Sequence, residues 1–270
     1  MAKNFVSVSG ISDISQLREI RDICLEEKIA FPVAIGYQLS NMSINQGTQN
    51  PRQPLFTDLP RLDEQTREYG FTTALHYYTR DNGTILDDMK KIVDCGIRPT
   101  LLQFNSLPPS LDILKQVKEM GFQILLKVAV SNKSSAEGGY KVWKGEGVED
   151  VSTGNVNPLF NQIYERRNFI DYAMFDASHG NNLELDLSQE SLAIIFGKMI
   201  TRNAELNNLG LMYAGGIKPS NVQRVTQQLQ GYFPERFSID TEGGVRVNDK
   251  LDLQLVRDYL VGYRDTIKKQ

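Results

Sequence analysis

Two pairs of glycines, each directly after an apolar run, are the residues whose type and spacing most plainly suggest chemistry. The first pair, Gly215 and Gly216, leads into a helical pattern that Pro219 opens. The second pair, Gly243 and Gly244, follows the next apolar run. Backbone without side chains lets an anion approach closely, and the amides at a helix N-terminus are free to bind it. We therefore predict a phosphate site at these four glycines, with simple tight turns as the alternative.

An acid and a base for proton transfer form the second feature. Asp176 follows the apolar run Tyr172–Phe175, so burial is expected to raise the pKa of its carboxyl and favour the neutral form that a proton donor needs. His179 comes three residues later, and an imidazole with a pKa of about 6.5 accepts a proton at neutral pH. We interpret the two as an acid and base pair, with a loop histidine of no role as the alternative. The other histidine, His76, lies in the predicted strand Thr72–Thr79 and is expected to face the same end of the fold.

Lys127, in a third apolar run, offers a different chemistry. A lysine desolvated inside a barrel can form a Schiff base with a carbonyl compound, which would make the protein an aldolase-type enzyme. A lysine that pairs with a charge at the strand end is the alternative. No His or Cys cluster in the sequence has the spacing of metal ligands, so we expect neither a metal nor another cofactor. The carboxylates Asp63 and Asp88 are expected on solvated helix faces.

Composition and charge restrict the partners. The 270 residues carry a formal net charge of −3, and 40% of them are apolar, which is ordinary for a globular protein. This balance creates no basic field that would attract nucleic acid or an anionic membrane, and no apolar run approaches the roughly 18 residues of a membrane span. The first residues lack the apolar segment of a signal peptide, and the two cysteines, Cys24 and Cys95, are far apart. We therefore expect a cytoplasmic protein.

Apolar runs that alternate with helical patterns predict the fold. The predicted strands are Phe5–Ile11, Phe31–Leu39, Thr72–Thr79, Arg98–Asn105, Gln123–Val130, Tyr172–Ser178, Leu209–Gly216 and Phe237–Thr241. The predicted helices are Asp13–Lys28, Asp63–Tyr69, Ile85–Cys95, Ser110–Met120, Pro158–Asn168, Ser188–Asn207, Pro219–Leu229 and Asp252–Lys268. Because each helix would be a crossover between parallel strands, eight such units predict a single (β/α)8 TIM barrel over residues 1–270. A doubly wound open sheet is the alternative.

Two connections are longer than a simple connector. Residues 40–60 follow the second predicted strand, and residues 131–157 follow the fifth. In a barrel both would lie at the C-terminal face, where active sites are found. We predict that they are long loops that act as lids or binding loops, with disordered segments as the alternative.

The segment around the first glycine pair resembles a known family. Ala214–Val222, Ala-Gly-Gly-Ile-Lys-Pro-Ser-Asn-Val, is similar to the Ala-Gly-Gly-Leu-x-Pro-x-Asn-Val motif of phosphoribosylanthranilate isomerase, a barrel enzyme of tryptophan biosynthesis. Asp240–Val245 is similar to that family's Asp-x-Ser-Ser-Gly-Val segment, with Glu242 and Gly243 in place of the serines. Weaker similarities are found at Ser9–Ser12, Leu102–Asn105 and Phe175–Leu187. The resemblance supports the barrel and a phosphosugar ligand.

The resemblance also implies a reaction and its residues. The family carries out an Amadori rearrangement, in which a general acid opens the sugar ring and a general base takes the proton from C2. Asp176 matches the acid, whereas Ser9 stands where the family has its cysteine base. A serine hydroxyl is too weak a base, so His179 is the candidate for a relocated base. The resemblance places further residues at the substrate, namely Gln103, Lys127, Asp240 and, without a match around it, Arg52.

These observations lead to three hypotheses. The first is an isomerase that acts on a phosphorylated sugar derivative with an altered base, without a cofactor, and with a homodimer left open. The second is a barrel that binds a phosphosugar without turnover, as a sensor or a decayed paralogue, because Ser9 replaces the catalytic thiol. The third is a Schiff-base aldolase that uses Lys127.

Overall fold

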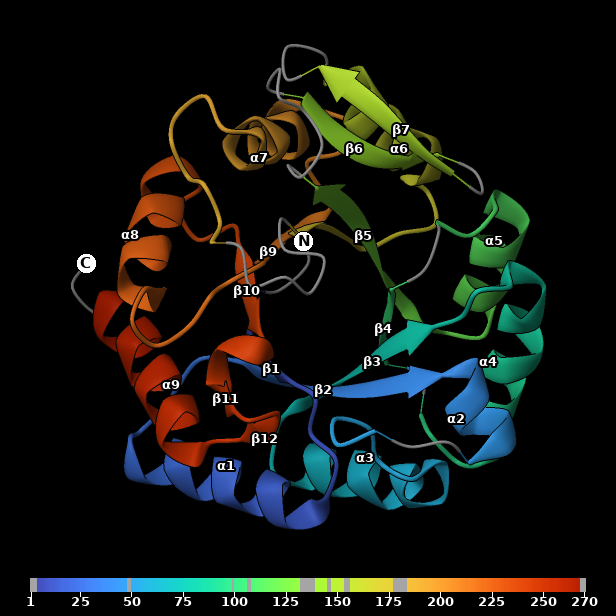
Figure 1. Ribbon diagram of the computed structural model, residues 1–270, viewed down its shortest axis with the longest axis vertical. Helices are drawn as coiled ribbons and strands as arrows, with labels where there is room; N and C mark the ends of the chain where they lie inside the picture. The colour runs from blue at the N-terminus through green and yellow to red at the C-terminus, as the bar shows by residue number, and fades with distance from the viewer. Residues whose placement is uncertain are drawn as a thin grey trace.

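Eight parallel strands close into a barrel that a ring of helices surrounds (Figure 1). The computed structural model describes residues 4–47, 50–98, 100–105, 108–131, 139–144, 147–152, 156–176 and 184–267, with residues 129–152 described by their backbone only. The barrel strands are β1 Val6–Ser9, β2 Val33–Ser40, β3 Thr72–Tyr78, β4 Leu101–Phe104, β5 Gln123–Ser131, β8 Tyr172–Asp176, β9 Gly210–Ala214 and β10 Ser238–Thr241. Each strand pairs in parallel with the next, and β10 pairs with β1. The predicted (β/α)8 barrel is confirmed.

The eight predicted helices are present and begin within about four residues of their predicted positions, and α2 is an additional helix. They are α1 Ile14–Glu26, α2 Asn41–Gln46, α3 Leu59–Glu68, α4 Ile85–Asp94, α5 Leu111–Glu119, α6 Asn157–Arg166, α7 Leu192–Arg202, α8 Val222–Tyr232 and α9 Leu253–Ile267. Short polar side chains cap several of them: Asp13 accepts hydrogen bonds from the amides of Ser15 and Gln16, and Ser110 accepts one from the amide of Ile113. These caps satisfy backbone donors that a helix leaves free at its N-terminus. No described helix is long and apolar enough to cross a membrane.

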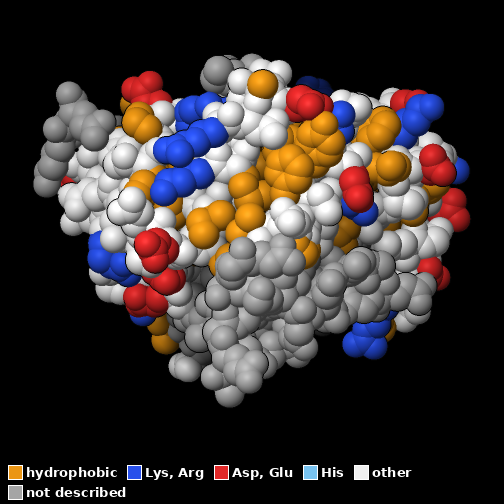
Figure 2. Space-filling model, turned by 90° about the horizontal axis from the view of Figure 1, so that it is seen from above, with side chains coloured by type: hydrophobic (Ala, Val, Ile, Leu, Met, Phe, Trp, Pro, Cys, Tyr) orange, Lys and Arg blue, Asp and Glu red, His pale blue; other side chains and the backbone are white. Residues whose placement is uncertain are grey.

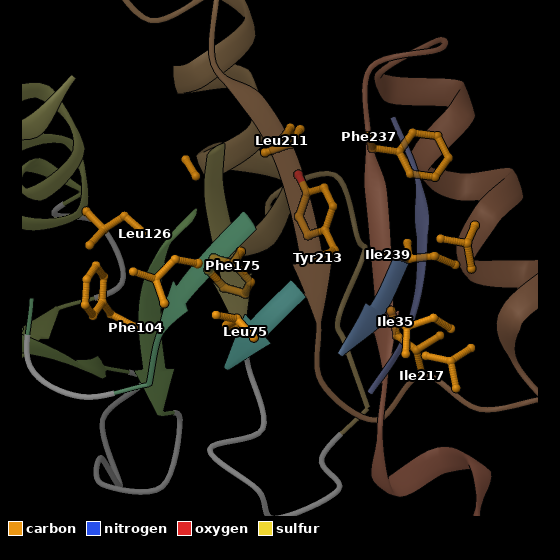
Figure 3. Close-up of a cluster of buried hydrophobic side chains, with 14 of the residues drawn as sticks. Ile35, Leu75, Phe104, Leu126, Phe175, Leu211, Tyr213, Ile217, Phe237 and Ile239 are labelled. Atoms are coloured by element: carbon orange, nitrogen blue, oxygen red, sulfur yellow. The ribbon is translucent and has the colours of Figure 1, made fainter. Parts of the chain in front are cut away.

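Side chains alternate between the two faces of every barrel strand. The outward side chains pack against the helices and form the larger apolar cluster, part of which Figure 3 shows. Inward side chains, most of them near the strand beginnings, form a second apolar cluster of Phe5, Ala34, Ala74, Leu101, Leu125, Tyr172, Met174, Met212 and Ala214, of which Met174 and Ala214 reach the cavity. Because a strand repeats every two residues, the next inward positions toward the C-terminal ends bring different side chains into the barrel, and most of these are polar. The apolar layer therefore forms the floor beneath a polar layer.

The two long connections contain regular structure that the sequence did not predict. Residues 40–60 include α2 and a short 3-10 helix, η1 Phe56–Asp58. Residues 131–157 include an antiparallel hairpin of β6 Gly139–Lys144 and β7 Gly147–Ser152, and β6 pairs with the end of β5. Both connections are long, as predicted, but they are not without regular structure. The glycines that suggested a loop lie at or beside the ends of the two hairpin strands, and glycines are common at hairpin turns.

The expectation that Asp63 and Asp88 lie on solvated faces was also wrong. Asp63 is 2% exposed and accepts a hydrogen bond from the hydroxyl of Thr73 at 2.6 Å. Asp88 is 1% exposed and accepts one from the hydroxyl of Tyr77 at 2.6 Å. Both donors are on β3, so these carboxylates join helices α3 and α4 to the barrel. Burial of such groups is tolerated because they are hydrogen-bonded.

The outer surface is mixed in character. Figure 2 shows one face on which apolar side chains gather in a band among charged ones. The large apolar side chains that are exposed come from well-separated parts of the sequence: Leu25, Met42, Leu55, Tyr78, Leu111 and Val247.

Candidate functional site

A cavity of about 280 Å³ lies at the C-terminal ends of the barrel strands. Its described walls consist mainly of the inward polar side chains and the loops after β9 and β10. The side chains at the strand ends are Gln38, His76, Gln103, Lys127, Asp176 and Asp240, and the loops contribute Gly215, Gly216, Gly243 and Gly244. The predicted substrate-binding and phosphate-binding residues therefore lie around one space, together with the predicted acid.

An ion pair joins two of the predicted residues inside the cavity. The Nζ atom of Lys127 on β5 lies 2.5 Å from Oδ2 of Asp176 on β8, and the two side chains are 17% and 8% exposed. The strands are neighbours in the barrel, and Lys127 pairs with Met174 in their register. A nearby cation favours the ionised form of a carboxyl group. The sequence argument for a neutral Asp176 considered burial alone, and this cation opposes it.

The same ion pair bears on the aldolase hypothesis. A Schiff-base lysine must lose its proton before its nitrogen can attack a carbonyl carbon. The carboxylate of Asp176 stabilises the charged amine of Lys127, so this geometry favours the charge-pairing role over the nucleophilic one.

Ser9 belongs to a buried cluster beneath the cavity. Its hydroxyl donates a hydrogen bond of 2.6 Å to Oδ1 of Asp240, lies 3.2 Å from the hydroxyl of Ser7 and lies 3.4 Å from Nε2 of His76. Ser9 is 0% exposed and is not part of the cavity wall, whereas Asp240 and His76 are. The structure therefore places Ser9 behind Asp240, where its side chain contacts catalytic candidates and not the cavity.

Burial shifts the ionisation of both groups that contact Ser9. It raises the pKa of the Asp240 carboxyl, and the charge of Glu242 raises it further, while His76 and the hydroxyls of Ser9 and Ser7 act in the opposite direction. Burial lowers the pKa of the His76 imidazole, against the attraction of Asp240 and Glu242. His76 is consequently expected to be neutral near pH 7.

The loop after β9 has a shape that requires its glycines and its asparagine. Gly215 and Gly216 adopt φ angles of 110° and 59°, which other residues rarely adopt. The side chain of Asn221 closes the loop, because its Oδ1 accepts from the amide of Lys218 at 2.9 Å and its Nδ2 donates to the carbonyl of Gly216 at 2.9 Å. Helix α8 begins at Val222, so the amides near the cavity come from this loop and not from the first turn predicted at Pro219.

The loop after β10 packs directly against the loop after β9. It forms a 3-10 helix, η3 Gly243–Val245. A Cβ atom on Gly244 would lie only 2.1 Å from the carbonyl oxygen of Ile217, so no larger residue fits without a shift of backbone. The first amides of a short helix have no acceptor within that helix. The contact brings both glycine pairs to one wall of the cavity.

A group of charges covers the outer edge of this wall. Arg52 lies 2.6 Å from a carboxylate oxygen of Glu242 and 2.5 Å from one of Asp249, next to a small hairpin of β11 Arg246–Val247 and β12 Lys250–Leu251. Arg52 and Glu242 line the cavity. The structure thus brings Arg52 to the predicted site, where its charge is balanced by two carboxylates.

Some residues of the site were missed or stay untested. Sequence reasoning missed Gln38, Asn105 and Glu242 as lining residues. Gln38 could have been found, because it lies two positions beyond Gly36 on the inward face of β2. His179, the predicted relocated base, lies outside the described residues. Among the described residues, no three His, Cys, Asp or Glu side chains are grouped so that they could hold a metal ion.

Comparisons with known proteins give structural neighbours only. No family model matches the sequence, and no curated protein sequence matches it. The fold is similar to that of TrpF from Jonesia denitrificans, with a TM-score of 0.60 and 14% identity over 100% of both chains. It is also similar to N-(5'-phosphoribosyl)anthranilate isomerase from Pyrococcus furiosus, with a TM-score of 0.58 and 17% identity over 97% of this chain and 99% of that one. A phosphoribosyl anthranilate isomerase in complex with reduced 1-(o-carboxyphenylamino)-1-deoxyribulose 5-phosphate has a TM-score of 0.58 and 14% identity over 98% of this chain and 100% of the other. At these identities the likeness shows a shared fold.

Proposed function

We propose that this barrel is an isomerase that acts on a phosphorylated sugar derivative. The observation that carries the proposal is the cavity, in which two carboxyl groups, Asp176 and Asp240, share one space with glycine-rich loops after β9 and β10. Many barrels bind phosphate at the loops after their seventh and eighth strands and at a short extra helix there. The isomerases of the same fold, one of them bound to a phosphorylated sugar derivative, agree with this proposal.

The chemistry fits the groups that are present. Conversion of an aldose derivative into a ketose derivative moves protons and rearranges bonds, and it needs a positioned acid and a positioned base. Asp176 and Asp240 are two such groups at the barrel mouth, on strands β8 and β10, which are separated only by β9. The neutral side chains of Gln38, Gln103 and Asn105 on another wall suit the hydroxyl groups of a sugar.

The general test is proton exchange in heavy water. A panel of phosphorylated aldoses, ketoses and glycosylamines is incubated with the protein in D2O and followed by NMR. We expect at least one member to show conversion, with deuterium at the carbon that gains a proton. Members that bind but show neither conversion nor exchange would instead support the second hypothesis, a barrel that binds phosphosugars without turnover.

We expect phosphoribosylanthranilate itself to be a poor substrate. Ser9 stands at the position of the family's base, and its hydroxyl donates to Asp240 beneath the cavity. The turnover number should lie well below the ordinary range of about 1–10³ per second. Product formation is measured at saturating substrate. The Ser9→Cys variant is the matched comparison and should stay equally slow, because the side chain at this position does not reach the cavity. Turnover within the ordinary range in the wild-type protein would contradict this prediction.

The phosphate wall is tested with Gly244→Ala. The added Cβ would meet the carbonyl oxygen of Ile217 at 2.1 Å and push the two loops apart. We expect the affinity for inorganic phosphate or a phosphosugar, measured by calorimetric titration, to fall about tenfold or more, which is about 1.4 kcal/mol. Gly231→Ala is the matched control, because a Cβ there meets nothing within 4 Å. Equal affinity in the two variants would place the anion elsewhere.

A further inference from the structure

We propose that Asp240 is the proton donor of this cavity and that Asp176, paired with Lys127, is the proton acceptor. This assignment rests on the proposed isomerase function and reverses the role that the sequence suggested for Asp176. It gives Asp240, expected only to bind substrate, a place in the chemistry.

Asp176 is held in the charged form by a direct partner. Its Oδ2 lies 2.5 Å from Nζ of Lys127, and both side chains are largely buried. If Asp176 were protonated instead, the ammonium group of Lys127 would be left inside the barrel without its counter-charge. A buried charge without a partner is strongly unfavourable. The pair therefore favours the carboxylate, which is the form that accepts a proton.

Asp240 has the opposite surroundings. Within the described part of the chain, no lysine or arginine forms an ion pair with it, and its side chain contacts the hydroxyl of Ser9 at 2.6 Å. The groups that face it are Ser7 and Ser9 on β1, His76 on β3, Glu242 on the following loop and the buried hydroxyl of Tyr259 on α9. His76 is itself buried and favours its neutral form, and Glu242 is negative. Burial and Glu242 both raise the pKa of Asp240, so its carboxyl keeps a proton to higher pH than an ordinary aspartate.

The charges of the cavity favour this assignment as a whole. With Asp176 ionised, Lys127 charged and Asp240 neutral, the three groups have no net charge and the two charges are in contact. The reverse assignment would leave Lys127 beside a neutral acid and put an anion at Asp240, where its described surroundings supply no full positive charge. When two carboxyl groups of one site have such different surroundings, the group that keeps its proton acts as the acid and the group that loses its proton acts as the base.

The proton transfers balance without an oxidant or another reactant. For a glycosylamine, the nitrogen lone pair forms a C1–N double bond as the C1–O bond of the ring breaks, and the ring oxygen takes the proton from Asp240. Asp176 then removes the C2 proton; the C–H electrons form the C1–C2 double bond, and those of the C1–N double bond return to nitrogen. The C2 hydroxyl next gives its proton to Asp240, forming the ketone, while C1 takes the proton from Asp176. Both carboxyl groups return to their initial states.

The test reads the two carboxyl groups directly in the free protein. Aspartate is labelled with ¹³C at the carboxyl carbon, and the chemical shifts are followed by NMR from pH 3 to pH 9. Asp176→Asn and Asp240→Asn assign the two signals. We expect the Asp240 signal to titrate at higher pH than the Asp176 signal. The reverse order overturns the assignment, and neither result depends on whether any substrate is converted.

Ser9→Ala gives a second measurement on the same signals. Loss of the hydroxyl that donates to Asp240 should move the titration of Asp240 to still higher pH and leave that of Asp176 in place. Ser191→Ala, which removes a buried hydroxyl at the start of α7, is the matched control and should move neither signal. An effect of Ser9→Ala on Asp176 alone would contradict the proposed contact.

A kinetic measurement follows if the D2O panel yields a substrate. The proton donor must be protonated and the acceptor ionised, so kcat/KM should fall at high pH with Asp240 and at low pH with Asp176. Asp240→Asn should remove the high-pH limb from any residual activity, and Asp176→Asn the low-pH limb. The opposite pattern overturns the assignment. Absence of any substrate in the panel would reject the proposed function, while the NMR result on the two carboxyl groups would still stand.

Discussion

At pH 7 the Asp240→Asn variant is expected to be more stable than the wild-type protein and at the same time inactive as an isomerase. Burial raises the pKa of the Asp240 carboxyl, so the folded state carries a group whose ionisation is unfavourable there. An amide of the same shape keeps an acceptor for the hydroxyl of Ser9 and never ionises. The free energy of unfolding at pH 7 should therefore be higher than that of the wild-type protein.

The pH dependence of this gain has a defined direction. Because the pKa of Asp240 is higher in the folded protein than in the unfolded chain, the folded state binds more protons between the two values. The wild-type protein therefore loses stability as the pH rises from about 4, near the ordinary pKa of aspartate, through the raised value. Asp240→Asn removes this loss, so the two proteins should differ little below about pH 4 and most at neutral pH.

Denaturant unfolding from pH 4 to pH 8 measures the difference. Asp87→Asn is the matched control, since the Asp87 side chain is 77% exposed and its substitution should change stability little at any pH.

The activity of Asp240→Asn is measured on a substrate found by proton exchange. Its rate of isomerisation should be lower than that of the wild type by roughly 10²–10⁴-fold. A variant that is less stable than the wild type at pH 7, or one that keeps full activity, would show that Asp240 has another role.

Lys127→Met should be strongly destabilising. It removes the cation that lies 2.5 Å from Asp176, whose carboxylate is largely buried. Removal of one partner of a buried ion pair costs about 3–5 kcal/mol, so we expect the free energy of unfolding at pH 7 to fall by about 3 kcal/mol. The loss should shrink as the pH is lowered, because protonation of Asp176 removes the negative charge that Lys127 stabilises.

A double-variant cycle separates the ion pair from packing effects. Lys127→Met combined with Asp176→Asn should recover most of the lost stability, since both charges of the pair are then absent. Lys90→Met is the matched control, because Lys90 is 63% exposed and lies 3.7 Å from Asp87 on the surface of α4. Pairs of that kind contribute only about 0–1 kcal/mol. If Lys127→Met cost no more than Lys90→Met in chemical denaturation, the buried pair would not stabilise the fold.

The sequence by itself determined the barrel, because the barrel depends on patterns that are local. Strand and helix periods, capping residues such as Asp13, and glycines that need a positive φ act within a few residues of each other. The same patterns brought the glycine pairs after β9 and β10 to the correct end of the barrel. Where local signals were ambiguous they misled: glycine-rich residues 131–157 suggested a loop, although part of the segment pairs with β5 as a hairpin.

Only the tertiary structure decided which groups surround the two carboxyl groups of the cavity. Ser9 and Asp240 are 231 residues apart in the sequence and form a hydrogen bond because β1 and β10 are neighbours in the closed barrel. Lys127 meets Asp176 because β5 and β8 pair, with the β6–β7 hairpin lying between them in the sequence. Whether a carboxyl group gives or takes a proton depends on its burial and on the charges within a few ångströms. Those neighbours come from strands that are distant in the sequence, so only closure and register of the sheet determine them.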